Sequence, residues 1–176
     1  MSFLRTLVDL LRAPKDGVMG MNRRNLEMVY PKNPRRHFTL VNHKLKTKGI
    51  LAAVGLPVSD TITTFGSFVE LDTFAVRLAG LDEFVIKPAN GSGGRGILVV
   101  AGREQVGDDV TYLTAGGRRL GGEEMRKHIA DIVFGVYTFD RADIAIVEPR
   151  LHPDPFFASL YPDGLSDVRV ITVDGQ

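Results

Sequence analysis

The most informative segment of the chain reads Phe84-Val85-Ile86-Lys87-Pro88-Ala89-Asn90-Gly91-Ser92-Gly93-Gly94-Arg95-Gly96-Ile97-Leu98-Val99-Val100. An apolar run ends in Lys87-Pro88, a loop with four glycines follows, and a second apolar run begins at Ile97. Apolar, β-branched runs that flank glycines predict two strands joined by a loop. Backbone N–H groups without Cβ bulk can approach phosphate oxygens closely, and Lys87 adds a positive charge just before them. This pattern predicts a phosphate-binding loop between two strands.

An ordinary β-hairpin without a ligand explains the same pattern, because glycine-rich loops are common turn material. Two features favour the phosphate interpretation. The loop is longer and richer in glycine than a tight turn requires. A lysine at the end of an otherwise apolar strand is also costly unless its ammonium group meets an anion or reaches solvent.

The residues Gly91 to Gly96 match the dinucleotide fingerprint G-x-G-x-x-G. That fingerprint requires a helix to open at the loop, whereas Ile97 to Val100 predicts a strand. No Gly-Lys-Ser/Thr follows, which excludes a Walker loop. In protein kinases the lysine lies on a strand after the glycine loop. Because Lys87 precedes the loop, the kinase arrangement is also disfavoured.

Composition sets broad limits on the fold and the chemistry. The chain has 176 residues, 44% apolar content and a formal charge of +1, which suits one domain or two small lobes. It contains no cysteine, so disulfides, cysteine-ligated zinc and thiol catalysis are excluded. The four histidines form no metal-spaced pair, and no metal ligand is assigned from the sequence.

The first half of the chain predicts helices and a basic surface. Residues 2–13 fit an amphipathic helix, and neither a signal peptide nor a membrane span is recognised, which favours a cytoplasmic protein. Residues 22–48 carry eight Lys or Arg side chains against Glu27 alone. A solvated basic face explains this charge better than a nucleic-acid surface, because few aromatic residues are interleaved. Part of the charge could instead face a polyphosphate or an acidic substrate.

Local patterns predict an α+β fold. Helices are expected at residues 22–29, at 44–54 after an Asn42 cap, at 68–79 after the capping box Ser67–Glu70, and at 123–136 with Met125, Ile129, Ile132 and Val133 inward. Besides the pair around the glycine loop, strands are expected at 58–65, 110–113, 118–120, 143–151 and 168–173, with a polar connection at 103–109. His128 is expected on a solvated face, and Phe156-Phe157 in packing. The final Asp174-Gly175 is a hairpin signal, so we expect the chain to be a fragment.

Four segments, in order, resemble motifs of the ATP-grasp superfamily. They are residues 42–58, 84–97, 146–151 and 166–170. The two most similar groups are the RimK-related alpha-L-glutamate-ligase-like proteins and the sugar-transfer-associated ATP-grasp proteins. The resemblance covers roughly residues 33–176 and implies three regions. These are an N-terminal helical region at 1–80, a small lobe with the glycine loop at 81–148, and the hinge and first strand of an incomplete large lobe at 149–176.

The resemblance also implies roles for individual residues. Lys44 and Lys87 would contact the ATP phosphates, and Arg169 would be catalytic by stabilising the transferred phosphate or a substrate carboxylate. The backbone of Glu148 and Leu151 would read the adenine edge, and Asp154 is the nearest candidate for the ribose hydroxyls. The loop that would close over the β- and γ-phosphates consists of Gly91, Ser92, Gly93, Gly94, Arg95 and Gly96.

Such a protein would be an ATP-dependent carboxylate–amine ligase, with glutamate among the acids it could activate. Its partners would be small-molecule or peptide carboxylates and amines, without membrane or nucleic acid. In the family, the acidic Mg²⁺ ligands follow the final strand, which corresponds here to residues 168–173. Those ligands are expected beyond Gln176, so this chain alone is expected to be inactive. His43 stands where the family often has Asp. Two alternatives stay open: a non-catalytic nucleotide-binding module, and a basic adaptor for nucleic acid or an acidic partner.

Overall fold

The computed structural model describes residue 17 and residues 19–161, 164–165, 167 and 170. The chain forms two compact units, which divide between Leu56 and Pro57. The expected helix at 2–13, Arg169 and most of the expected strand at 168–173 lie outside the described residues. The three regions divided after residues 80 and 148 stay a prediction.

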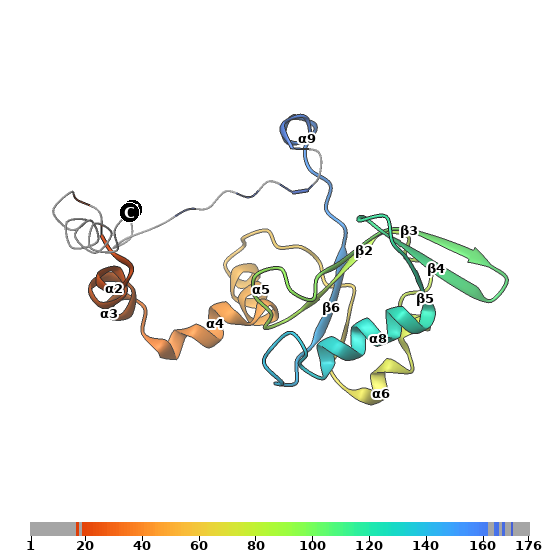
Figure 1. The fold of residues 1–176 in the computed structure, drawn as a ribbon, viewed down its shortest axis with the longest axis horizontal. Coiled ribbons are helices and arrows are strands. Elements are labelled where there is room, and N and C mark those ends of the chain that lie inside the picture. Colours follow the sequence, from red (N-terminus) through yellow and green to blue (C-terminus); the bar gives the residue numbers. More distant parts are fainter. Residues whose placement is uncertain (1–16, 18, 162–163, 166, 168–169, 171–176) are drawn as a thin grey trace, which may run out of the picture. The chain divides into compact units, whose positions relative to one another are not determined.

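The first unit is helical within its described residues (Figure 1). Its elements are α2 (Met21–Arg24), the π-helical turn η2 (Asn25–Val29), α3 (Tyr30–Lys32), the 3₁₀ turn η3 (Arg35–His37), α4 (Phe38–Asn42) and α5 (Lys44–Ala53). The helix expected at 22–29 is therefore present and continues to Lys32.

The start of α5 differs from the sequence prediction. Asn42 is the last residue of α4, and His43 occupies the N-cap of α5. The two helices follow one another with a single extended residue between them, which leaves no room for Asn42 to act as a cap. The helix ends at Ala53, one residue before the expected end, and Gly55 follows with a φ of +77° in the left-handed region and donates its N–H to the Ala52 carbonyl.

The second unit contains a six-stranded antiparallel sheet in the order β1-β6-β2-β3-β4-β5 (Figure 1). Its strands are β1 (Thr63–Phe65), β2 (Phe84–Pro88), β3 (Leu98–Val106), β4 (Asp109–Thr114), β5 (Arg119–Gly121) and β6 (Ala145–Pro149). The mixture of helices and antiparallel strands agrees with the predicted α+β class. The strand β6 lies between β1 and β2, although it comes last of the six in the sequence.

Two strand boundaries correct the prediction. The expected strand at 58–65 forms only over its last three residues. The expected polar connection at 103–109 is instead the outer end of β3, where Arg103 pairs with Tyr112 and Val106 pairs with Asp109. Polar residues occupy this end because residues 104–106 are exposed, so burial does not demand an apolar alternation there.

The helix α8 (Gly122–Val133) covers one face of the sheet (Figure 1). Burial alternates along β2, so that Phe84 and Ile86 are fully buried in the core while Val85 and Lys87 face the opposite side. The inward residues predicted for α8 are confirmed as buried: Met125, Ile129, Ile132 and Val133. Each large apolar side chain buried here contributes about 1.5–3 kcal/mol. The face that carries Lys87 is therefore available for a site.

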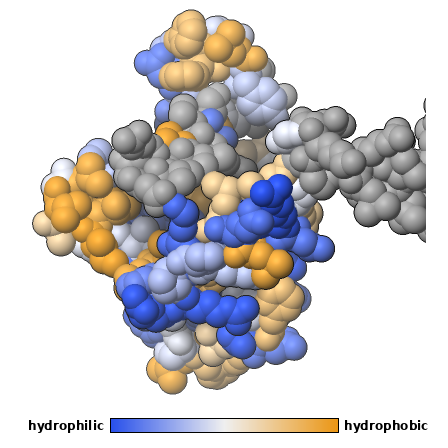
Figure 2. All heavy atoms as spheres, turned by 90° about the vertical axis from the view of Figure 1, so that its left-hand side faces the viewer, coloured by the Kyte–Doolittle hydropathy of each residue, from blue (hydrophilic) through white to orange (hydrophobic). Residues whose placement is uncertain are grey.

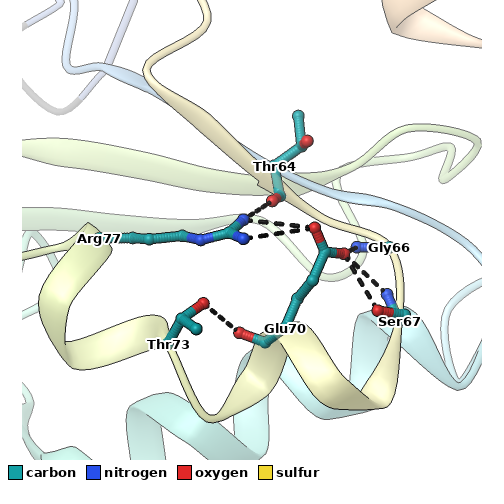
Figure 3. A network of polar contacts seen from close by, with 6 residues as sticks. All are labelled: Thr64, Gly66, Ser67, Glu70, Thr73 and Arg77. Atoms are coloured by element: carbon teal, nitrogen blue, oxygen red, sulfur yellow. Dashed lines mark hydrogen bonds and ion pairs between the residues drawn. The ribbon is translucent and has the colours of Figure 1, made fainter.

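The predicted helix at 68–79 divides into α6 (Phe68–Leu71) and α7 (Phe74–Arg77). The Thr73 hydroxyl donates to the Glu70 carbonyl over 2.6 Å, which helps to close α6 before α7 begins (Figure 3). The predicted capping box is confirmed, because Glu70 Oε2 accepts the Ser67 N–H at 3.1 Å. Arg77 pairs with Glu70 and donates to the Thr64 carbonyl over 2.7 Å, so the helix pair is tied to β1.

The short helix α9 (Pro155–Leu160) follows β6. Phe156 and Phe157 are 64% and 44% exposed, so they do not pack in a core, and the expected packing between lobes stays a prediction. The two rings contact each other edge to face, with centroids 5.4 Å apart. Figure 2 shows apolar surface at the top of the molecule, where α9 lies in Figure 1.

Candidate functional site

A cavity of about 710 Å³ lies against the face of the sheet opposite α8. The strands β2, β3 and β6 supply its walls through Val85, Lys87, Val99 and Glu148. The β4–β5 turn and the segment after β6 complete it. Antiparallel pairing sets this composition, since Val85 lies opposite both Val99 and Glu148 and residues directly opposite share a face.

The most buried charged side chains that line the cavity are Lys87 and Glu148, and they form an ion pair. Lys87 Nζ donates to Glu148 Oε2 over 2.5 Å. Glu148 is only 4% exposed, and the Lys87 side chain is 23% exposed. A carboxylate buried to this extent requires a cationic partner, because removing it from water without one is costly. The pair holds the lysine ammonium group at the cavity wall.

The side chain of Glu148 is a feature that the sequence prediction missed, because only its backbone was given a role. The pair joins residues 61 positions apart, and it depends on the register in which β2 and β6 lie side by side. The available signal was weak: each residue is a charged side chain within an apolar strand.

A second cluster fixes the segment after β6. Arg150 Nη1 donates to Glu83 Oε1 over 2.6 Å, and His152 Nε2 donates to Glu83 Oε2 over 2.8 Å. The hydrogen bond from His152, with the charges of His152 and Arg150, lowers the pKa of Glu83. Arg150 and Leu151 line the cavity, so these contacts tie one wall to the residue that precedes β2. The sequence prediction missed Arg150.

The glycine loop joins β2 to β3 next to the cavity. Gly93, Gly94 and Gly96 have φ values of +65°, +75° and +75°, which only glycine adopts readily. Two internal hydrogen bonds of the loop are long: Arg95 N–H to the Ser92 carbonyl at 3.4 Å and Ile97 N–H to the Gly94 carbonyl at 3.3 Å. Ile97 lines the cavity, whereas the six loop residues are not among its lining residues.

One end of this loop contacts the connection between α8 and β6, and the other end contacts α8 itself. Asp143 accepts from the backbone and side chain of Asn90, and His128 Nε2 donates to the Gly96 carbonyl over 3.2 Å. His128 is therefore half-buried against the loop, and its expected position on a solvated face is wrong. Burial lowers the pKa of His128, although the hydrogen bond to Gly96 acts in the opposite direction.

The structure brings together three of the predicted site residues: Lys87, Glu148 and Leu151 all line the cavity. Lys44 begins α5 in the first unit, and its role stays a prediction. Asp154 accepts the Phe156 N–H at 2.9 Å and caps α9, and its proposed contact with ribose stays a prediction. Arg169 lies outside the described residues.

Comparison with family models adds an independent finding. The model described as sugar-transfer associated ATP-grasp matches residues 23–176. The chain belongs to the sugar-transfer associated ATP-grasp family. The resemblance to the ATP-grasp superfamily and the fold it implies are thereby confirmed, while a relationship to the RimK-related group stays a prediction. No match was found among curated proteins, and none among solved structures.

Membership places this ATP-grasp chain in a superfamily of ATP-binding, ligase-type proteins. ATP-grasp membership also implies a magnesium site. Among the described residues, no group of three or more histidine, aspartate or glutamate side chains is arranged to hold a metal ion. These residues therefore do not fit a magnesium site by themselves. No described helix is both long enough and apolar enough to cross a membrane.

Proposed function

We propose that this ATP-grasp chain binds ATP in the cavity between the glycine loop and the segment after β6, as part of an enzyme that joins a carboxylate to an amine. The observation that carries the proposal is the Lys87–Glu148 pair at the cavity wall, directly before the loop. The cavity of about 710 Å³ is of the size that small-molecule and cofactor sites occupy.

The walls suit the two halves of a nucleotide. Val85, Ile97 and Val99 offer apolar surface to a flat base, and the backbone of Glu148 and Leu151 would contact the edge of the adenine. The triphosphate would extend toward Lys87 and the glycine loop. Lys87 would then share its charge between Glu148 and the phosphates, so it would be held in place before the nucleotide enters.

The proposed reaction has two steps. A carboxylate oxygen of the acid attacks the γ-phosphorus of ATP, the bond to the β–γ bridging oxygen breaks, and ADP leaves. The amine then attacks the acyl carbon, its proton passes to solvent, and inorganic phosphate leaves. The described residues would contribute positioning and charge compensation, which supply much of the catalysis of phosphoryl transfer. No step is assigned to magnesium, because the described residues do not fit it.

Calorimetric titration of the full chain with ATP tests the binding part of the proposal. Lys87→Ala should weaken ATP binding about tenfold or more, because a charge-assisted contact with phosphate is lost. Lys127→Ala is the matched control, since Lys127 is an exposed lysine that pairs with Asp131 on α8. Equal affinities of the wild type and Lys87→Ala would contradict the assignment of Lys87.

The reaction itself is tested on the full-length protein, by ADP formation in the presence of carboxylates, including glutamate and short peptides, with and without amines. ADP formation that depends on the acid, followed by an amide product, would support the ligase. ATP binding without any ADP formation would contradict the ligase reaction and favour a nucleotide-binding module.

A further inference from the structure

The glycine loop is held by residues that follow it by 32 to 53 positions. We call His128, Tyr137 and Asp143 the loop seat. His128 lies on α8, and the other two lie in the connection from α8 to β6. The seat contacts the loop at its two ends, through Asn90 and Gly96.

The first end of the loop is fixed by a buried carboxylate. Asp143 is 3% exposed and accepts three donors: the Asn90 N–H at 3.0 Å, Asn90 Nδ2 at 2.7 Å and the Ile144 N–H at 2.7 Å. The Ala89 N–H also donates to the Ile144 carbonyl over 2.9 Å. Asn90 therefore cannot turn without leaving a buried carboxylate short of donors, which is costly.

The second end is fixed by a hydrogen bond and by close packing. His128 Nε2 donates to the Gly96 carbonyl over 3.2 Å. The Tyr137 ring lies against the Cα of Gly96, so closely that a Cβ there would be 2.6 Å from Tyr137 Cδ2. The rings of His128 and Tyr137 lie side by side, with centroids 6.0 Å apart. Gly96 is therefore held from both its carbonyl and its Cα.

The tip of the loop has a different kind of contact. The Arg95 guanidinium group lies over the exposed Phe139 ring, 5.4 Å from its centroid. Phe139 has a φ of +57°, an unusual value for a bulky residue, and it gains little burial in return. A cation–π contact at an exposed site is weak, so it can be exchanged for a contact with an anion.

We propose that the loop seat positions the glycine loop for the triphosphate, with Asp143 fixing Asn90 and with His128 and Tyr137 fixing Gly96. The loop then meets the phosphate oxygens from two fixed ends, and it loses less conformational freedom on binding than an unanchored loop would. The inference rests on the proposed function. His128, Tyr137 and Asp143 are positioning residues, because they act through the loop.

The experiment makes three measurements on the wild type and on each variant. These are the affinity for ATP, the affinity for adenosine, and the rate of tryptic cleavage after Arg95 in the absence of nucleotide. His128→Ala removes the donor to Gly96, and Asn90→Ala removes a donor to Asp143 without altering the buried carboxylate. Each should weaken ATP binding about tenfold, leave adenosine binding within about twofold, and speed cleavage about fivefold. His128→Gln keeps an N–H donor and should recover most of the loss.

Lys127→Ala is the control, because Lys127 precedes His128 on α8 but pairs with Asp131. If the variants lost affinity for ATP and for adenosine equally, the seat would have a merely structural role and the proposal would be overturned. Unchanged ATP affinity would overturn it too, even if cleavage were faster. A wild-type chain that binds no nucleotide would overturn the proposed function and this inference together, whereas failure of the seat alone would appear only in the variants.

Discussion

Two glycine-containing connections of the same sheet differ in what holds them. The β4–β5 turn is closed mainly by its own residues, since the Thr114 N–H donates to the Arg118 carbonyl over 2.8 Å and Thr114 Oγ1 accepts the Arg118 N–H at 2.9 Å. The Ala115 N–H also donates to the Val99 carbonyl of β3 over 2.9 Å. The glycine loop between β2 and β3 has long internal bonds and is fixed at its ends by His128 and Asp143.

The difference separates a structural turn from a candidate ligand loop. A turn that satisfies its own backbone groups has few donors left to offer, whereas a loop held from outside keeps its shape without using them. Glycine content alone does not make this distinction, because both connections contain glycines at positive φ. The two connections are distinguished by where their hydrogen-bond partners lie in the sequence: mainly within the turn for the β4–β5 connection, and far along the chain for the glycine loop.

The largest effect is expected from a matched pair of glycine substitutions. Gly96 and Gly117 have φ values of +75° and +80°, but only Gly96 is crowded, by Tyr137. Gly96→Ala should lower the free energy of unfolding by about 3 kcal/mol, through backbone strain and overpacking, and Gly117→Ala by about 1 kcal/mol, through strain alone. Urea unfolding measures both.

Adding Tyr137→Ala to Gly96→Ala is the control, because it removes the crowding and leaves the strain. The double variant should then lose less free energy of unfolding than the sum of the losses of the two single variants. Equal losses for Gly96→Ala and Gly117→Ala would show that the seat does not press against the loop.

The ion pairs of the two regions should also differ in how much they contribute to the free energy of unfolding. Glu148→Gln should lower the free energy of unfolding by about 2 kcal/mol, because it leaves the partly buried Lys87 ammonium group without its carboxylate. Glu104→Gln breaks the solvent-exposed pair with Arg119 between β3 and β5 and should have no measurable effect. A double-mutant cycle with Lys87→Met checks that the loss comes from the pair; strict additivity would refute the coupling.

The smallest expected effect is a pH dependence confined to the glycine loop region. Burial lowers the pKa of His128 below its ordinary value of 6.5, so the unfolded chain binds more protons than the folded chain just below that pH. The free energy of unfolding should therefore fall as the pH drops through this window, from about pH 7 downward. Urea unfolding of wild type and His128→Gln checks this, and identical pH slopes for the two would contradict it.

Local patterns in the sequence were sufficient for several elements of the second unit. The strands around the glycine loop, the Ser67–Glu70 capping box and the buried face of α8 each depend on residues close together in the chain. The outer end of β3 escaped prediction, because polar residues on an exposed strand carry the same composition as a loop.

The candidate site was only partly predictable. The position of Lys87 beside a glycine loop is a local feature, and in the structure this lysine lines the cavity. The carboxylate that holds it and the two ends of the loop depend on pairings across 61, 53 and 32 positions. Such pairings follow from the order of strands in the sheet, which periodicity in a single sequence does not specify.

The place of β6 in the sheet has a consequence for biosynthesis. This strand separates β1 from β2, yet it leaves the ribosome after all five others. Until then β1 has no neighbour and β2 presents one unpaired edge, the kind of edge along which chains aggregate. A nascent chain halted before Ala145 would display both edges at once, so the interval before β6 emerges is when aggregation along these edges is most favoured.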